Sequence, residues 1–155
     1  MNLLKGRGMP HKTVYWEDVK EGQELPVLTK EVTATTIIAG AFAFRDFHPS
    51  HHDRDFAVKR GAPDIYMSIP TTSGWVSKYL TDWTGPEGEI KRMTFRLETP
   101  CFPGATFTWA GKVIKKYTEG DQHLLDVEYS AMVPMGIHCI GTATLSLPTR
   151  GVGIW

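Results

Sequence analysis

The stretch that decides the fold runs from residue 65 to residue 80 and reads IYMSIPTTSGWVSKYL. We expect a long buried helix here, because apolar residues recur at approximately helical spacing, at Ile65, Ile69, Val76 and Leu80. Pro70 would break the middle of a helix, but amides of the first turn have no intrahelical partner, so a proline there costs little. We therefore place the helix start near residues 67–69, where backbone N–H groups remain free.

Four segments after this helix are rich in β-branched and aromatic residues, which favours strands. They span residues 90–98, 106–117, 123–133 and 137–147, after a loop expected at 81–86, and turn sequences with Gly or Pro separate them. Consecutive strands with short turns imply an antiparallel sheet, and a long apolar helix needs a surface to pack against. The predicted fold class is therefore α+β, a curved antiparallel sheet wrapped around a central helix.

Two shorter elements precede the helix. Residues 27–33 alternate well enough for a strand, and Thr35 or Thr36 can cap a helix that continues through Phe44. Residues 1–14 lack periodicity, and we expect a flexible arm. Residues 15–155 are expected to form one domain.

The charge balance gives no sign of a nucleic-acid or membrane partner. Seventeen Lys+Arg balance seventeen Asp+Glu, whereas a dedicated nucleic-acid binder usually carries a basic excess. No apolar run approaches the ~20 residues of a membrane span. With two cysteines and no recognisable signal peptide, we expect reduced thiols and a cytoplasmic location. A net charge near zero also fits association into an oligomer.

The charged segment 45–57 carries the candidate chemistry. It holds three of the six histidines, and Pro49 breaks any regular element through its middle. Asp46 and His51 lie five residues apart across this bend, where a carboxylate and an imidazole can converge on one small molecule such as water. Such a pair could do general acid and base catalysis. The alternative is structural: Asp46 caps a turn and His51 bonds a backbone carbonyl.

A metal site is a weaker interpretation of the same segment. His48, His51, His52 and Asp53 are ligand types for zinc or iron, but adjacent histidines tend to point to different sides of an extended chain. We therefore expect no metal, and expect His52 and Asp53 to hydrogen-bond the bend. The remaining candidates are ordinary: His123 and His138 fit strand positions, Cys101 lacks a nearby base, and Trp75, Tyr79 and Trp83 fit a core or a dimer contact.

The charged segment resembles the hydratase motif of the MaoC-like, (R)-specific enoyl-CoA hydratase family, usually Asp-x-Asn-Pro-x-His-x-Asp-x-x-Phe-Ala. Here it reads Asp46-x-His48-Pro49-x-His51-x-Asp53-x-x-Phe56-Ala57. Similarity extends to Trp16-Glu17-Asp18-Val19-x-x-Gly22, Pro103-Gly104-Ala105-Thr106, Gly136 and Gly141-x-Ala143, and so covers residues 15–147. The resemblance implies the hot-dog fold, a curved antiparallel sheet around a long central helix.

Other segments look closer to one branch of that family, the small subunit of actinobacterial hydratases that act on steroid side chains as CoA thioesters. These segments are Gly61-x-x-Asp64-Ile65, Thr81-Asp82-Trp83-x-Gly85-Pro86, Ile90-Lys91 and Phe95-Arg96-Leu97. The branch works as heteromers, and the resemblance implies that this chain is the catalytic partner. It also implies a hot-dog dimer, and no cofactor beyond the CoA of the substrate.

The resemblance implies addition of water across a 2-enoyl-CoA double bond, with Asp46 and His51 as catalytic residues. The thioester oxygen gains negative charge and needs N–H donors, which the backbone of Met67, Ser68 and Ile69 at the helix start would supply. Two departures stand out: His48 replaces the usual Asn, and Tyr66-Met67-Ser68 replaces the usual Ala-His-Gly. Lys91 and Arg96 are candidates for the CoA phosphates, with ordinary surface charge as the alternative.

Two other functions remain open. A hot-dog thioesterase would direct water at the thioester carbonyl instead of the double bond. A non-catalytic binding or scaffolding subunit of an acyl-CoA complex would use neither Asp46 nor His51.

Overall fold

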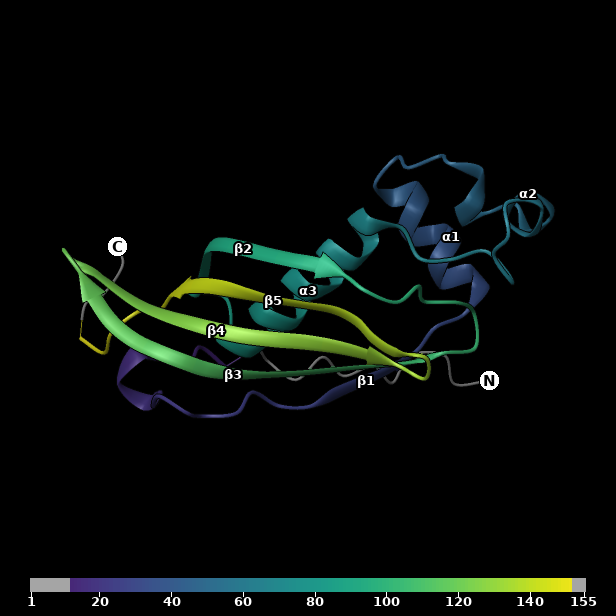
Figure 1. Cartoon of the computed structure of the whole chain (residues 1–155). Coiled ribbons are helices and arrows are strands. Elements are labelled where there is room, and N and C mark those ends of the chain that lie inside the picture. The colour runs from purple at the N-terminus through teal and green to yellow at the C-terminus, as the bar shows by residue number, and fades with distance from the viewer. Residues whose placement is uncertain (1–11, 152–155) are drawn as a thin grey trace, which may run out of the picture.

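The computed structural model describes residues 12–151, and it places the short helices before the long one and most strands after it (Figure 1). The helices are α1 (Ala34–Ala43), α2 (Arg54–Lys59) and α3 (Ile69–Thr84), with one-turn 3-10 helices η1 (Trp16–Asp18) and η2 (Pro49–His51). The strands are β1 (Leu28–Glu31), β2 (Glu89–Leu97), β3 (Thr106–Glu119), β4 (Gln122–Val133) and β5 (Gly136–Ser146).

The five strands form one sheet in the order β1-β3-β4-β5-β2, with every neighbouring pair antiparallel. The sheet curves, α3 lies along one of its faces, and α1 and α2 lie together at one end of α3 (Figure 1). This confirms the predicted α+β class and the hot-dog arrangement.

Helix α3 begins as predicted and ends later than predicted. Ser68 is its N-cap, with a side chain that accepts from the Thr71 N–H, and Pro70 falls in the first turn. The expected loop at 81–86 is wrong for residues 81–84, which stay helical because Thr84 is still buried in the core. The stop is Gly85, whose φ of 79° favours glycine.

Helix α1 is capped by a residue other than the two expected. Neither Thr35 nor Thr36 is the N-cap; Thr33 has the extended backbone of a cap and its side chain accepts from the Thr36 N–H at 3.1 Å. Thr36 takes part from the third helical position, where its hydroxyl accepts from the Thr33 N–H at 3.4 Å. The strand expected at 27–33 is shorter, since Thr33 already belongs to this cap.

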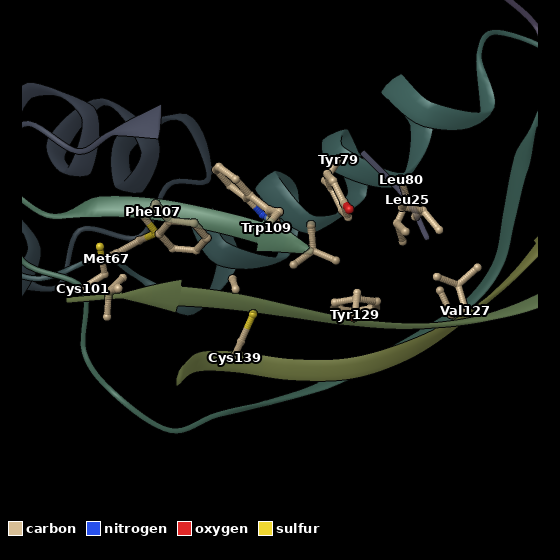
Figure 2. Close-up of a cluster of buried hydrophobic side chains, with 14 of the residues drawn as sticks. Leu25, Met67, Tyr79, Leu80, Cys101, Phe107, Trp109, Val127, Tyr129 and Cys139 are labelled. Atoms are coloured by element: carbon tan, nitrogen blue, oxygen red, sulfur yellow. The ribbon is translucent and has the colours of Figure 1, made fainter. Parts of the chain in front are cut away.

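The core lies between α3 and the concave side of the sheet (Figure 2). Its fully buried side chains come from both layers and include Val76, Leu80, Phe107, Leu125 and Val127. Of the aromatic residues expected in a core or a dimer contact, Tyr79 is buried in the core. Trp75 is partly buried and packs on Phe107 and Trp109, with ring centroids 5.3 Å and 5.5 Å apart.

The predicted arm and the last four residues lie largely outside the described part. Residues 1–11 and 152–155 are not described, and Val14, at the end of the predicted arm, donates its N–H to the Thr84 carbonyl at 2.9 Å. Within residues 12–151, no helix is both long enough and apolar enough to cross a membrane.

Candidate active site

The backbone turn at the end of α1 sets the position of Asp46. The N–H groups of Arg45 and Asp46 turn back to the carbonyls of Phe42 and Ala41, at 3.0 Å and 2.9 Å, which closes the helix in a Schellman arrangement. This arrangement needs a left-handed residue, and here it is Arg45, with φ of 57°. Asp46 is the first residue after this turn, three residues before η2 begins at Pro49.

The η2 turn holds His51 through bonds made by its neighbours. His48 is the N-cap, its Nδ1 accepting from the Ser50 N–H at 3.4 Å, so the residue that replaces the usual Asn still supports the bend. Asp46 Oδ1 accepts from the His48 N–H at 3.3 Å. The Ser50 carbonyl accepts from the Tyr66 N–H at 3.2 Å, which ties η2 to the residues before α3.

Asp46 and His51 face each other. The His51 Nδ1 lies 2.7 Å from the Tyr66 carbonyl, which can only accept, so Nδ1 carries a hydrogen. The other ring nitrogen, Nε2, lies 3.5 Å from Asp46 Oδ2. The His51 side chain is 10% exposed and the Asp46 side chain 26% exposed, so the pair is sheltered and still reachable.

The structural alternative accounts for only half of this geometry. The two bonds it predicted are present, since Asp46 accepts from a backbone N–H and His51 bonds a carbonyl. They use Oδ1 and Nδ1. Oδ2 and Nε2 remain opposite each other, slightly beyond ordinary hydrogen-bond length, and one small molecule can contact both.

The start of α3 lies two residues beyond Tyr66 and presents free backbone donors. The Met67 N–H donates to the Cys101 carbonyl at 2.9 Å. The N–H groups of Ser68 and Ile69 have no acceptor among residues 12–151, as expected for the first positions of a helix. Of the three residues expected to bind substrate, Met67 and Ser68 are buried and Ile69 is exposed.

The other titratable residues of the segment serve the fold. Asp53 hydrogen-bonds within its own segment, as expected, but the bond caps α2, which the sequence did not predict: Asp53 Oδ1 accepts from the Phe56 N–H at 3.0 Å. The expectation for His52 is wrong: its ring packs against Phe42 at 5.3 Å, and its buried Nδ1 has no partner among the described residues. Nowhere in residues 12–151 do three His, Cys, Asp or Glu side chains gather as a metal site would require.

The candidate phosphate-binding and nucleophilic residues outside the charged segment show no sign of a second site. Lys91 pairs with Glu89 and Arg96 with Glu98. Burial raises the pKa of the Cys101 and Cys139 thiols to about 11, so neither is an activated nucleophile. A cavity of about 800 Å³ lies between residues 24–27 and strands β2–β5; its lining includes Phe95 and Tyr129 but neither Asp46 nor His51.

Sequence reasoning missed a buried polar contact beside the helix start. His138 lies on a strand, β5, as expected, but it is buried and bonds Thr72 in the first turn of α3. A lone histidine in a strand gives no signal for this, because its partner lies 66 positions away in the chain.

A curved antiparallel sheet around one long helix, with a charged turn at the start of that helix, defines a hot-dog domain of the hydratase type. The chain is 38% identical over 126 residues to the β subunit of 3-oxo-4,17-pregnadiene-20-carboxyl-CoA hydratase from Mycobacterium tuberculosis H37Rv. That match covers 81% of this chain and 95% of the subunit. No profile of a known protein family matches the chain.

Solved structures agree. A chain of the ChsH1–ChsH2 complex from Mycobacterium tuberculosis gives a TM-score of 0.77 at 38% identity, over 83% of this chain and 98% of that one. The (R)-hydratase PhaJ1 from Pseudomonas aeruginosa gives 0.80 at 16% identity, over 89% of this chain and 88% of that one, a likeness of fold alone. The chain belongs to the MaoC-like (R)-specific enoyl-CoA hydratase family, which confirms the resemblance found in the sequence.

Proposed function

We propose that this chain is the catalytic subunit of an enoyl-CoA hydratase that adds water across the 2-enoyl double bond of a bulky, steroid-type acyl-CoA. The observation that carries the proposal is the pair of opposed atoms, Asp46 Oδ2 and His51 Nε2, 3.5 Å apart beside the start of α3. The relationship to the β subunit of a pregnadiene-carboxyl-CoA hydratase supports the substrate class.

In this mechanism the pair holds one proton and binds the attacking water. The unprotonated member takes a proton from water while the hydroxyl adds at the β-carbon, and the protonated member supplies a proton at the α-carbon. The hydrogen bond from His51 Nδ1 to the Tyr66 carbonyl keeps the ring oriented throughout. Exchange with solvent restores the starting protonation.

The thioester oxygen would be stabilised by the start of α3. It gains negative charge during the addition, and free N–H groups at a helix N-terminus suit such a charge. The amides of Ser68 and Ile69 are free for this role, whereas that of Met67 is committed to Cys101. Met67 would contribute only its side chain.

We expect the working enzyme to contain a second MaoC-like chain. Large apolar side chains near the pair are exposed, namely Phe42 on α1, Phe44 and Phe47 between α1 and η2, and Ile69 at the start of α3. The ChsH1–ChsH2 structure contains two kinds of chain. Light scattering of this chain alone, and of this chain co-expressed with a MaoC-like neighbour, should show a larger mixed assembly in the second sample. A mass unchanged by co-expression would favour a homo-oligomer.

The reaction is tested by incubating that assembly with 3-oxo-4,17-pregnadiene-20-carboxyl-CoA and, separately, with but-2-enoyl-CoA. Hydration removes the enoyl-thioester absorbance and releases no thiol, and we expect the steroid substrate to react faster. Release of free thiol would identify a thioesterase instead. No reaction with either substrate would leave the scaffolding role.

A further inference from the structure

A buried histidine on the sheet is bonded at both ring nitrogens. His138 lies on β5, and its Nδ1 is 2.6 Å from the Thr99 carbonyl. Its Nε2 is 2.9 Å from the Thr72 hydroxyl, and its ring packs edge-on against Phe107. Because the carbonyl can only accept, Nδ1 carries the hydrogen, and in the neutral ring Nε2 accepts from Thr72.

Thr72 connects this histidine to the N-cap of α3. The Thr72 N–H donates to the Ser68 carbonyl at 3.1 Å, and its hydroxyl lies 3.3 Å from the same carbonyl. Ser68, Thr72 and His138 are all buried. Buried polar groups that satisfy one another rigidify their surroundings, while the loss of one leaves the others unpaired.

The same end of α3 is held from a second side. The Met67 N–H donates to the Cys101 carbonyl at 2.9 Å, and His138 bonds Thr99 of the same connecting segment. The first turn of α3 is therefore fixed relative to both β5 and the loop that follows β2. The Ser68 and Ile69 amides share that turn, so their direction is set by these contacts.

We infer that His138 is a positioning residue: through Thr72 it holds the first turn of α3 so that the Ser68 and Ile69 amides point at the thioester oxygen. The inference rests on the proposed function, because those amides matter to the rate only if a thioester binds there. His138 and Thr72 bond neither Asp46 nor His51. Misplacing the donors weakens an interaction made in the transition state, so kcat should fall while KM changes little.

The test compares paired variants in the intact assembly with 3-oxo-4,17-pregnadiene-20-carboxyl-CoA and but-2-enoyl-CoA as probes. Thr72→Val keeps the shape and removes the hydroxyl, and Thr72→Ser keeps the hydroxyl. We expect Thr72→Val to lower kcat by about 10- to 100-fold with KM within about 2-fold, and Thr72→Ser to restore most of the rate. A merely structural role predicts that kcat falls only in step with thermal stability, because Thr72→Val leaves the buried His138 Nε2 unpaired and Thr72→Ser leaves a small cavity.

Two substitutions of His138 give a second, independent pair. Gln can place its amide near the position of Nε2 and reach Thr72, whereas Asn reaches only toward Thr99. We expect His138→Gln to retain more activity than His138→Asn. If Thr72→Val does not fold, the comparison of His138→Gln with His138→Asn tests the positioning role on its own.

Thr84 supplies the matched control. It is a buried threonine at the other end of α3, roughly 18 Å away along the helix at 1.5 Å per residue, and its hydroxyl bonds only nearby carbonyls. Thr84→Val should leave kcat unchanged. Full activity in Thr72→Val and in His138→Asn, with wild type active and Asp46→Asn inactive, overturns the positioning role alone. An inactive wild type overturns the proposed function and this inference with it.

Discussion

Asp46 and His51 each use one polar atom to hold the backbone and leave the other polar atom free. Asp46 uses Oδ1 to accept from the His48 N–H, and His51 uses Nδ1 to hold the Tyr66 carbonyl. Each bond fixes the direction in which the remaining atom points. The fold therefore specifies the 3.5 Å separation of Oδ2 and Nε2 without consuming either atom.

Arg45 adopts a backbone conformation that favours glycine, and relieving it should stabilise the protein. At φ of 57° an arginine in place of glycine costs about 1–2 kcal/mol at this C-terminal position of α1. We expect Arg45→Gly to raise the free energy of unfolding by about 1 kcal/mol, since glycine also gains freedom in the unfolded chain. Urea unfolding monitored by tryptophan fluorescence measures the change.

Arg45→Val is the matching control, because a β-branched residue tolerates positive φ poorly. It should lower the free energy of unfolding. If Arg45→Gly is also destabilising, the arginine side chain makes a contact worth more than the backbone strain.

The motif predicted these residues, but it did not predict the geometry between them. The spacing of Asp46 and His51 around Pro49 was visible in the sequence, whereas the short helix α2 and the capping role of Asp53 were not predicted. The positive φ at Arg45 could not be predicted, because arginine, unlike glycine, does not indicate a left-handed backbone. The packing of His52 against Phe42 was also hidden, because it depends on how α1 and η2 meet in space.

At the level of elements, α1 packs closely against α3 at Gly40. A Cβ placed on Gly40 would lie 2.6 Å from the Thr71 side chain, which is buried and bonded to Ser68. The two helices can approach this closely only because Gly40 has no side chain. This contact places the end of α1, and with it Asp46, against the start of α3.

Gly40→Ala should therefore force the helices apart. We expect a loss of about 1–3 kcal/mol in the free energy of unfolding, although alanine is the better helix former. The hydration rate should fall as well, because Asp46 moves with α1. Thermal melting and the enoyl-CoA assay measure the two effects.

Gly74→Ala is the control on the facing helix. Its added Cβ would also meet a side chain at 2.6 Å, but that atom is the far end of the exposed Phe44 ring, which can move. We expect stability between unchanged and about 1 kcal/mol higher, from helix propensity. Equal losses in both alanine variants would show that Gly40 has no special role.

His138 makes stability depend on pH in the acid range. Burial lowers the pKa of His138, with the bond to the Thr99 carbonyl opposing the shift. The unfolded chain then binds a proton more readily than the folded one, so the free energy of unfolding falls as the pH drops below about 6.5. Urea titrations between pH 7 and pH 5 should show a shallower decline in His138→Gln than in wild type.

Parallel curves for the two proteins would contradict that assignment. Every other histidine is the same in both proteins, so the difference between the curves isolates residue 138.

The ends of elements show where sequence patterns succeed. Pro70 and Gly85 mark the two ends of α3, and the start was placed correctly from Pro70. The end was misplaced because Thr81–Thr84 reads as polar, although Thr84 is buried and Lys78 pairs with Asp82 at 2.6 Å. The sequence does not distinguish Thr33, Thr35 and Thr36 as candidates for the N-cap of α1. Thr33 is the N-cap because its backbone is extended where the helix begins.

For the whole molecule, the order of segments was enough to predict the architecture. A long apolar helix followed by four β-rich segments has few ways to bury its surface, and the sheet around α3 is one of them. Neither the acyl group nor the second chain follows from this order. Both depend on exposed surfaces, such as those of Phe47 and Ile69, which the order of segments does not specify.

Hydration rates of wild type, Asp46→Asn and His51→Asn in the intact assembly test the central claim most directly. Asn at 51 can still donate to the Tyr66 carbonyl but lacks Nε2, and Asn at 46 keeps an acceptor for the His48 N–H. We predict that each substitution lowers kcat by about 10²–10⁴-fold, with melting temperatures close to that of wild type. Variants that keep the wild-type rate, or that lose activity only in step with folding, would contradict the claim that Asp46 and His51 hydrate the substrate.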